Sequence, residues 1–97
     1  MAVIGKRNFF YNKIAITATA FPSVAQFEFP FHSSKIIIIN DATDDVALIF
    51  SFRLPHIDGE LFCSDEAIIF DGLAEDRVYM KLSAAGSAQV RVWAWRS

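Results

Sequence analysis

The chain has 97 residues, a net charge of −2 and a hydrophobic content of 54%. This length fits a single domain, and the single cysteine, Cys63, excludes a scaffold of internal disulfides. The longest uninterrupted apolar run, residues 36–39, is far shorter than the roughly 20 residues of a membrane-spanning helix. We therefore expect a domain that assembles in a reducing cytoplasm, has no membrane partner and carries more apolar side chain than its core needs.

The first twelve residues show no clear alternation of apolar and polar side chains. We expect an arm over residues 1–12 that becomes ordered against a partner, followed by a folded domain over residues 13–97. The arm ends in Phe9, Phe10 and Tyr11. We expect these three side chains at a protein interface, where aromatic residues are enriched.

Three strands are expected next along the chain. Residues 13–20 alternate apolar with polar side chains, which predicts a strand. Residues 26–31 carry three phenylalanines on one face, and Pro30 predicts an edge position because proline cannot donate a ladder hydrogen bond. Residues 35–40 contain four consecutive isoleucines, and such a β-branched run predicts a strand buried on both faces.

The middle of the chain continues with short strands. Residues 46–53 alternate, and apolar runs at 61–63 and 66–70 predict two more strands, while residues 71–76 have room for one helical turn. With the last two strands, the chain holds seven to eight strands, separated by turn signals every eight to twelve residues. This pattern predicts an all-β fold, a single antiparallel β-sandwich of jelly-roll or immunoglobulin-like type.

The last two predicted strands, residues 77–82 and 89–96, flank a turn at 84–87. One face of each strand is apolar. The other face carries aromatic and cationic side chains, namely Tyr79, Lys81, Arg91, Trp93 and Trp95. We expect the two strands to pair as a hairpin, which places these five side chains together on one outer face.

Nothing in the sequence predicts catalysis or a metal site. The clustered aspartates Asp41, Asp44 and Asp45 lack the twelve-residue pattern of a calcium loop. The candidate zinc ligands lack the paired spacing of such sites; they are His32, His56 and Cys63. The sequence also has no glycine-flanked serine elbow. We expect a protein that is not an enzyme and that uses no cofactor.

The predicted aromatic and cationic face has three interpretations. A protein interface is the leading one, because interface cores are rich in aromatic residues and arginine. A carbohydrate-binding module is the second, because Trp rings stack on sugars. Nucleic-acid binding, with Arg77 and Arg96 added, conflicts with the acidic net charge.

Charge is unevenly distributed along the chain. Residues 41–76 hold ten acids and one base, whereas the remaining residues hold eight bases and one acid. The leading interpretation is that the acids occupy turns, which Asp favours. The alternative is that the segregation serves head-to-tail docking between copies.

Two motifs near the end of the chain are RVYMK at residues 77–81 and VRVWAW at residues 90–95, with an AAGS turn between them. Together with the isoleucine run and the strand over residues 46–52, they make residues 33–97 similar to small virion proteins of tailed bacteriophages. The resemblance implies a β-sandwich present in many copies on a capsid or tail, in a structural role such as decorating or cementing a shell. The implied partners are other virion proteins and further copies of the chain, and the implied location is the virion.

Overall fold

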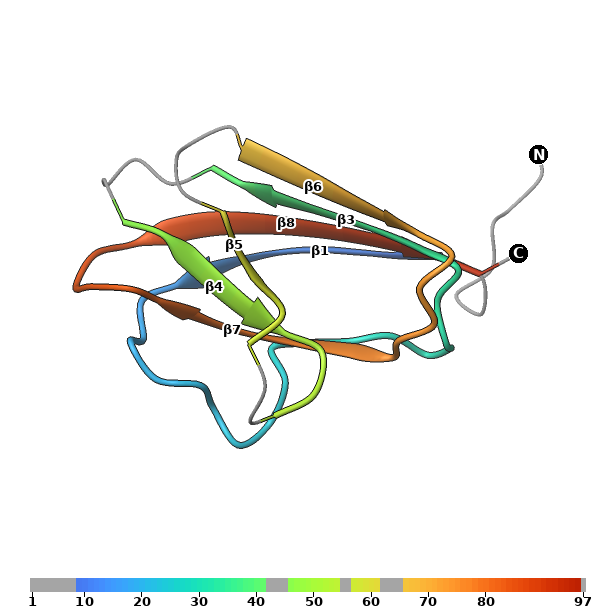
Figure 1. The fold of residues 1–97 in the computed structure, drawn as a ribbon, viewed down its shortest axis with the longest axis horizontal. Helices are drawn as coiled ribbons and strands as arrows, with labels where there is room; N and C mark the ends of the chain where they lie inside the picture. Colours follow the sequence, from blue (N-terminus) through green and yellow to red (C-terminus); the bar gives the residue numbers. More distant parts are fainter. Residues whose placement is uncertain (1–8, 42–45, 55–56, 62–65, 97) are drawn as a thin grey trace.

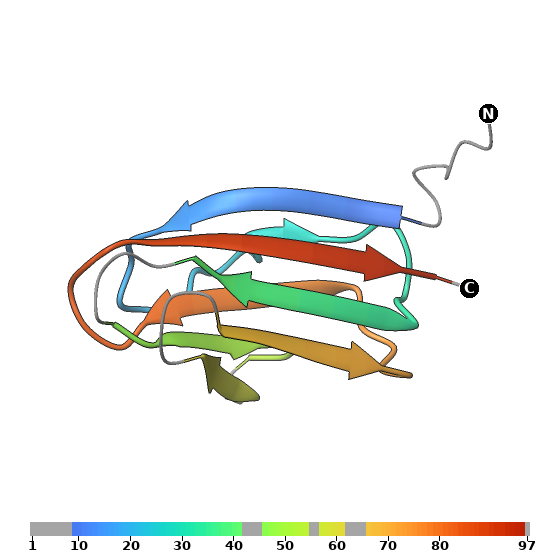
Figure 2. The same cartoon turned by 90° about the horizontal axis from the view of Figure 1, so that it is seen from above.

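The computed structural model describes residues 9–41, 46–54, 57–61 and 66–96. These residues form two four-stranded sheets, ordered β1-β8-β3-β6 and β2-β7-β4-β5, which pack face to face (Figures 1 and 2). The described ranges contain no helix that is long and apolar enough to cross a bilayer. The strands are β1 (Phe9–Ile16), β2 (Phe27–Glu28), β3 (Lys35–Asn40), β4 (Leu48–Ser51), β5 (Gly59–Leu61), β6 (Glu66–Asp71), β7 (Arg77–Leu82) and β8 (Ala88–Trp95).

The strands pair as if one long hairpin were rolled into two layers. β1 pairs with β8, β2 with β7, β3 with β6, and β4 with β5, all antiparallel. This nested pairing, divided between two sheets, is that of a jelly roll. The predicted all-β sandwich is therefore confirmed, and of the two expected types the jelly roll is the one observed.

The core lies between the two sheets. Every second residue of each long strand faces inward, as the alternation along a strand requires. The fully buried side chains include Ile36, Ile38, Val90 and Val92 from the first sheet and Leu48, Phe50, Val78 and Met80 from the second. The three phenylalanines at 27, 29 and 31, which were predicted to share one face, are all buried, and β2 is an edge strand that ends before Pro30.

Strand β1 begins earlier than predicted. It spans Phe9–Ile16 and pairs with β8 along its whole length. Residues 9–12 therefore belong to the sandwich, and the arm predicted over residues 1–12 does not include them. The remaining arm residues, 1–8, lie outside the described ranges. The helical turn predicted over residues 71–76 is also not observed, because residues 73–75 form an irregular connection.

The isoleucine run in β3 is not buried on both faces. Ile36 and Ile38 are fully buried in the core, whereas Ile37 and Ile39 point to the outer face and remain partly exposed. The prediction was wrong because a continuous apolar run does not reveal whether a second layer covers its outer side.

Strands β7 and β8 do not pair as a hairpin. β7 lies in the second sheet and β8 in the first, and residues 83–87 cross from one sheet to the other (Figure 1). Alternation correctly predicted which side chains of each strand face inward. It cannot distinguish two strands that pair side by side from two strands that face each other across a core, because both arrangements bury the same residues.

Candidate functional site

The outer face of the first sheet carries an apolar row that crosses all four strands. In the sheet register, Trp93 lies between Tyr11 on β1 and Ile37 on β3. Ile37 in turn lies beside Ile69 on β6. Residues opposite one another in antiparallel strands share a face and contact each other. The four side chains therefore form one continuous stripe.

Two further rows flank this stripe. The first runs through Phe9, Trp95, Lys35 and Asp71, and the second through Lys13, Arg91, Ile39 and Ala67. We call the surface formed by these three rows the aromatic face. Its charged residues lie only in the flanking rows, so the centre of the face is uncharged.

The aromatic side chains of β1 and β8 contact each other in pairs. The ring centroids of Tyr11 and Trp93 are 4.9 Å apart with an interplanar angle of 40°. Those of Phe9 and Trp95 are 5.5 Å apart, at 57°. Both pairs lie within the range of favourable aromatic contacts. The rings therefore hold each other in place before any partner arrives.

Arg91 is held against this face by two partners. Its Nε donates to Asp41 Oδ2 at 2.6 Å and its Nη2 donates to Asp41 Oδ1 at 3.2 Å. The guanidinium carbon lies 5.4 Å from the ring centroid of Trp93, within the range of a cation–π contact. A bidentate pair orients the planar guanidinium. It also joins one acid of the acidic segment to one base of the C-terminal segment within a single chain.

The ends of the apolar row are exposed. Tyr11 retains 46% of its accessible surface and Ile69 retains 59%, while Trp93 and Ile37 are partly exposed between them. Single exposed apolar residues are common, whereas contiguous exposed patches mark interaction sites. The aromatic face is such a patch.

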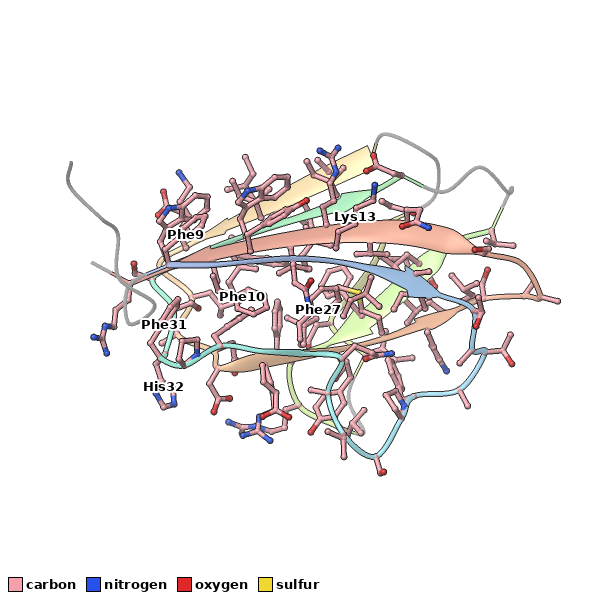
Figure 3. The ribbon with its side chains drawn as sticks, turned by 180° about the vertical axis from the view of Figure 1, so that it is seen from behind. Phe9, Phe10, Lys13, Phe27, Phe31 and His32 are labelled. Atoms are coloured by element: carbon pink, nitrogen blue, oxygen red, sulfur yellow. The ribbon has the colours of Figure 1, made fainter. Side chains whose placement is uncertain are left out.

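The structure brings together five of the eight residues predicted at an interface: Phe9, Tyr11, Arg91, Trp93 and Trp95. Phe10 points the other way, into the sandwich (Figure 3), where its ring lies 4.9 Å from that of Phe29 and 6.5 Å from that of Phe27. The prediction for Phe10 was wrong because it assumed that residue 10 belongs to an arm. In strand β1, Phe9 and Tyr11 face outward, so Phe10 between them faces the core.

Tyr79 and Lys81 lie on the opposite side of the molecule from Trp93. They belong to β7 and point outward from the second sheet. The five-residue patch expected from a hairpin is therefore divided between two sheets. Sequence reasoning missed the contributions of Ile37 and Ile69, because only the pairing of β3 with β6 and β8 places them in the row.

The outer face of the second sheet is more enclosed. On β4, Ile49 retains only 9% of its accessible surface and Ser51 retains none, although both point away from the core. Their partners in β7 are Lys81 and Tyr79. We call the surface formed by these four residues the covered face.

Residues 18–26 lie along β7 and supply partners to it. The Gln26 side chain donates to the Met80 carbonyl at 2.8 Å and accepts from the Met80 amide at 3.0 Å. Leu82 N donates to the Ala18 carbonyl at 2.8 Å, and Lys81 Nζ lies 4.8 Å from the Phe21 ring centroid. The loop before β2 thus engages both the backbone and the side chains of β7.

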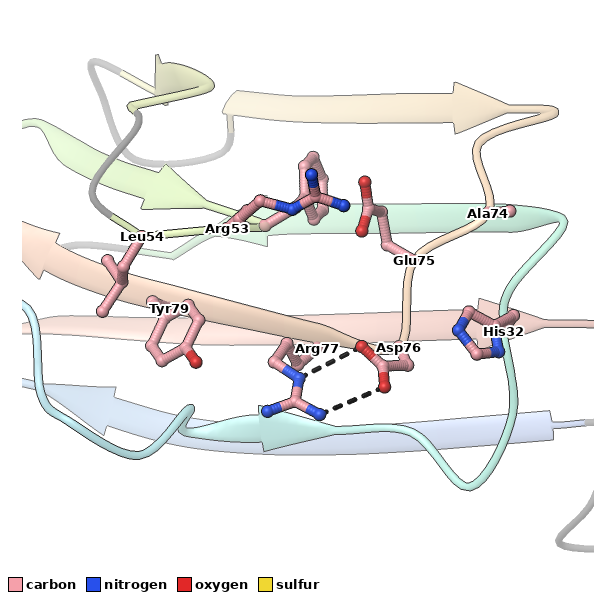
Figure 4. A pocket seen from close by; sticks show the side chains of 9 residues that line it. His32, Arg53, Leu54, Ala74, Glu75, Asp76, Arg77 and Tyr79 are labelled. Atoms are coloured by element: carbon pink, nitrogen blue, oxygen red, sulfur yellow. Dashed lines mark hydrogen bonds and ion pairs between the residues drawn. The ribbon is translucent and has the colours of Figure 1, made fainter.

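An open cleft of about 540 Å³ lies at one end of the second sheet (Figure 4). Its charged lining includes Arg53, Glu75, Asp76 and Arg77. Arg77 donates to both carboxylate oxygens of Asp76, at 3.1 and 3.2 Å. These hydrogen bonds hold the pKa of the Asp76 carboxyl below its usual value and raise the pKa of Arg77. Because its acids and bases are balanced, the cleft lacks the one-sided charge of a phosphate or metal site.

Of the six residues considered as metal ligands, the structure describes two, Asp41 and His32. Asp41 is occupied by Arg91, and His32 lies at the cleft (Figure 4). The other four candidates lie outside the described ranges: Asp44, Asp45, His56 and Cys63. Among the described residues, no group of three His, Cys, Asp or Glu side chains is placed to hold a metal ion.

No protein-family model matches this chain, and no curated protein matches it. Among solved structures, a cupin-superfamily sugar phosphate isomerase from Silicibacter pomeroyi is similar, with a TM-score of 0.54 and 13% identity. The match covers 93% of this chain and 52% of the isomerase chain, so the chain spans about half the length of that protein. At this identity the similarity shows a shared β-sandwich fold.

Two weaker structural similarities involve proteins of matching length. A pilus protein of Bacillus endospore appendages has a TM-score of 0.45 and 14% identity, over 100% of this chain and 96% of the other. The SPBc2 prophage-derived protein YomS has a TM-score of 0.48 and 11% identity, over 97% of this chain and 98% of the other. The structures similar to this chain therefore include a prophage protein and a pilus protein.

Proposed function

We propose that the chain is a structural subunit of a bacteriophage virion and that it binds other protein subunits through the aromatic face. Its proposed role is to decorate or cement the capsid, and a place on the tail is the alternative. The virion assignment is supported by the resemblance of residues 33–97 to small virion proteins of tailed phages. The jelly roll does not itself favour one role, because such folds host many functions.

The apolar row carries the proposal that the partner is a protein. Tyr11, Trp93, Ile37 and Ile69 span the whole width of the sheet, and the flanking rows add cations around them. An uncharged centre with charged residues at the rim is the usual composition of a protein interface. The aliphatic half of the row also favours a protein over a sugar, because sugar sites rely on aromatic platforms with polar neighbours.

The test is recovery of the chain in purified phage particles from cells whose phage genome encodes it. Density-gradient centrifugation followed by mass spectrometry should find the wild-type chain in the particles. An Ile69→Glu variant should be lost from them, because it places a charge in the apolar row. Ile57→Glu is the matched control, since Ile57 is 57% exposed but lies outside the aromatic face. Absence of the wild-type chain from particles contradicts the proposal.

A carbohydrate-binding module is the second candidate, because Trp93 and Trp95 lie on one partly exposed face. Titration of the intrinsic fluorescence with a panel of glycans separates the two functions. The protein-interface proposal expects no saturable change with any glycan. A saturable quenching that is lost in Trp95→Ala would favour sugar binding.

A further inference from the structure

We infer that the aromatic face binds the aromatic face of a second copy of this chain, around a two-fold axis that follows the apolar row. The inference rests on the proposed function and names the first partner of that surface. In an interface of this symmetry the same patch serves both copies and must be complementary to itself. Three features of the face support such a contact: its area, the position of its apolar row and the arrangement of its flanking rows.

The first feature is area. Neighbouring strands lie about 4.8 Å apart, and side chains on one face repeat every ~6.8 Å along a strand. The four strands and the three rows of the aromatic face therefore cover about 19 by 20 Å, or roughly 390 Å² of flat area. Two copies together bury about 780 Å² before the relief of the side chains is counted, which fits the small, weakly binding end of specific interfaces.

The second feature is the position of the apolar row. A two-fold axis along the row lays its four side chains against the same four of the other copy. Tyr11 and Ile69, the exposed ends, then become buried together with Trp93. The row is central and uncharged, so the most desolvated part of the contact contains no unpaired charge.

The third feature is the exchange of the flanking rows. The same axis lays each flanking row over the other flanking row of the partner copy. On β1, Lys13 of one copy thus approaches Phe9 of the other copy. On β8, Arg91 of one copy approaches Trp95 of the other. The strand directions of two sheets that pack face to face differ by about 30°. The rows therefore meet each other without an exact pairing of their atoms. Lys13 and Arg91 then lie near aromatic rings, a favourable contact. On the other two strands, Lys35 and Asp71 come to lie over Ile39 and Ala67 of the other copy.

Sedimentation velocity over a wide concentration range tests this inference. The wild-type chain is expected to be a dimer at micromolar concentration and to dissociate on dilution. Ile69→Glu is expected to raise the dissociation constant by at least about 100-fold, because the substitution buries two unpaired charges in each dimer. The matched control Ile57→Glu is expected to change it by less than about twofold, as is usual for truncations and substitutions outside an interface.

Tyr11→Glu provides a second variant at the other end of the row, and circular dichroism confirms that each variant remains folded. A wild-type chain that stays monomeric overturns the inference, as does a dimer that Ile69→Glu and Tyr11→Glu leave intact. If the chain is a monomer but is recovered on phage particles, and Ile69→Glu abolishes that recovery, only the self-pairing is overturned. A dimer that is absent from particles overturns only the proposed function.

Discussion

The two outer faces of this sandwich differ in how much of the surface of their outward-pointing side chains remains exposed. On the covered face, Ile49 retains 9% of its accessible surface and Ser51 retains none. On the aromatic face, Ile69 retains 59% and Tyr11 retains 46%. Strands β7 and β8, one from each sheet, show the same alternation of buried and partly exposed residues, so this pattern does not explain the difference.

The two sheets also differ in what lies beside them. Residues 18–26 run along β7 and satisfy part of its backbone through the Gln26 amide. The described residues place no comparable segment against the aromatic face, where the side chains instead contact one another in rows. We therefore expect the buried Ile49 to contribute to folding stability, and we propose the exposed apolar surface of the aromatic face for binding.

The largest expected contrast comes from the same substitution on each face. Ile49→Ala is expected to lower the free energy of unfolding by about 2–4 kcal/mol, because it opens a cavity at a buried position. Ile69→Ala is expected to change it by less than about 0.5 kcal/mol in dilute protein, as is usual at exposed positions. Urea unfolding at low protein concentration measures both. Equal losses for the two variants would remove the distinction between the faces.

A second contrast compares two glutamines. Gln26→Ala leaves the backbone amide and carbonyl of Met80 without their side-chain partner. We expect a loss of about 1–3 kcal/mol, the cost of unsatisfied buried polar groups. Gln89→Ala, at an exposed position on β8, is expected to cost less than about 0.5 kcal/mol. A Gln26→Ala variant as stable as the Gln89→Ala variant would show that these two hydrogen bonds contribute little to the stability of β7.

A smaller effect concerns the ion pair at the rim of the aromatic face. A double-mutant cycle on Arg91→Ala and Asp41→Ala is expected to give a coupling energy of about 0.5–1 kcal/mol, because both side chains are partly solvent-screened. The coupling should fall when the salt concentration is raised to 1 M. A coupling of zero at low salt would mean that the pair does not position Arg91 over Trp93.

The smallest effect is a pH dependence on the second sheet. The hydrogen bonds from Arg77 hold the folded-state pKa of Asp76 below its ordinary value of 3.8. The stabilisation is therefore present above that value and is lost as the pH falls through the lower, folded-state pKa. Urea unfolding at several acidic pH values should show a decline that is shallower in Asp76→Asn. An identical decline in both proteins would contradict a contribution from this pair.

Much of the architecture could be predicted from residue patterns. Alternation in residues 77–82 and 89–96 correctly predicted the inward faces of β7 and β8, and Pro30 correctly predicted an edge strand. Alternation is a local property, however, and it does not specify which strands become neighbours. That is why the hairpin between β7 and β8 was predicted in place of the observed pairs β1–β8 and β2–β7.

The same limit applies to the site. Trp93 and Trp95 were identifiable because they stand opposite an apolar face on their own strand. Ile37 and Ile69 were not, because they join Trp93 only through the registers of β3 with β8 and β6. The pairing of Arg91 with Asp41 joins residues 50 positions apart, which no local pattern reveals.

The most direct test of the aromatic face uses the chain's own fluorescence. Its only two tryptophans, Trp93 and Trp95, both lie on this face, so acrylamide quenching of their emission reports its accessibility alone. Quenching is expected to weaken as the protein concentration rises from nanomolar to high micromolar in the wild type and in Ile57→Glu, but to stay constant in Ile69→Glu. Quenching that is independent of concentration in the wild type, and unchanged by purified phage particles, would contradict the proposal that this face is a binding surface.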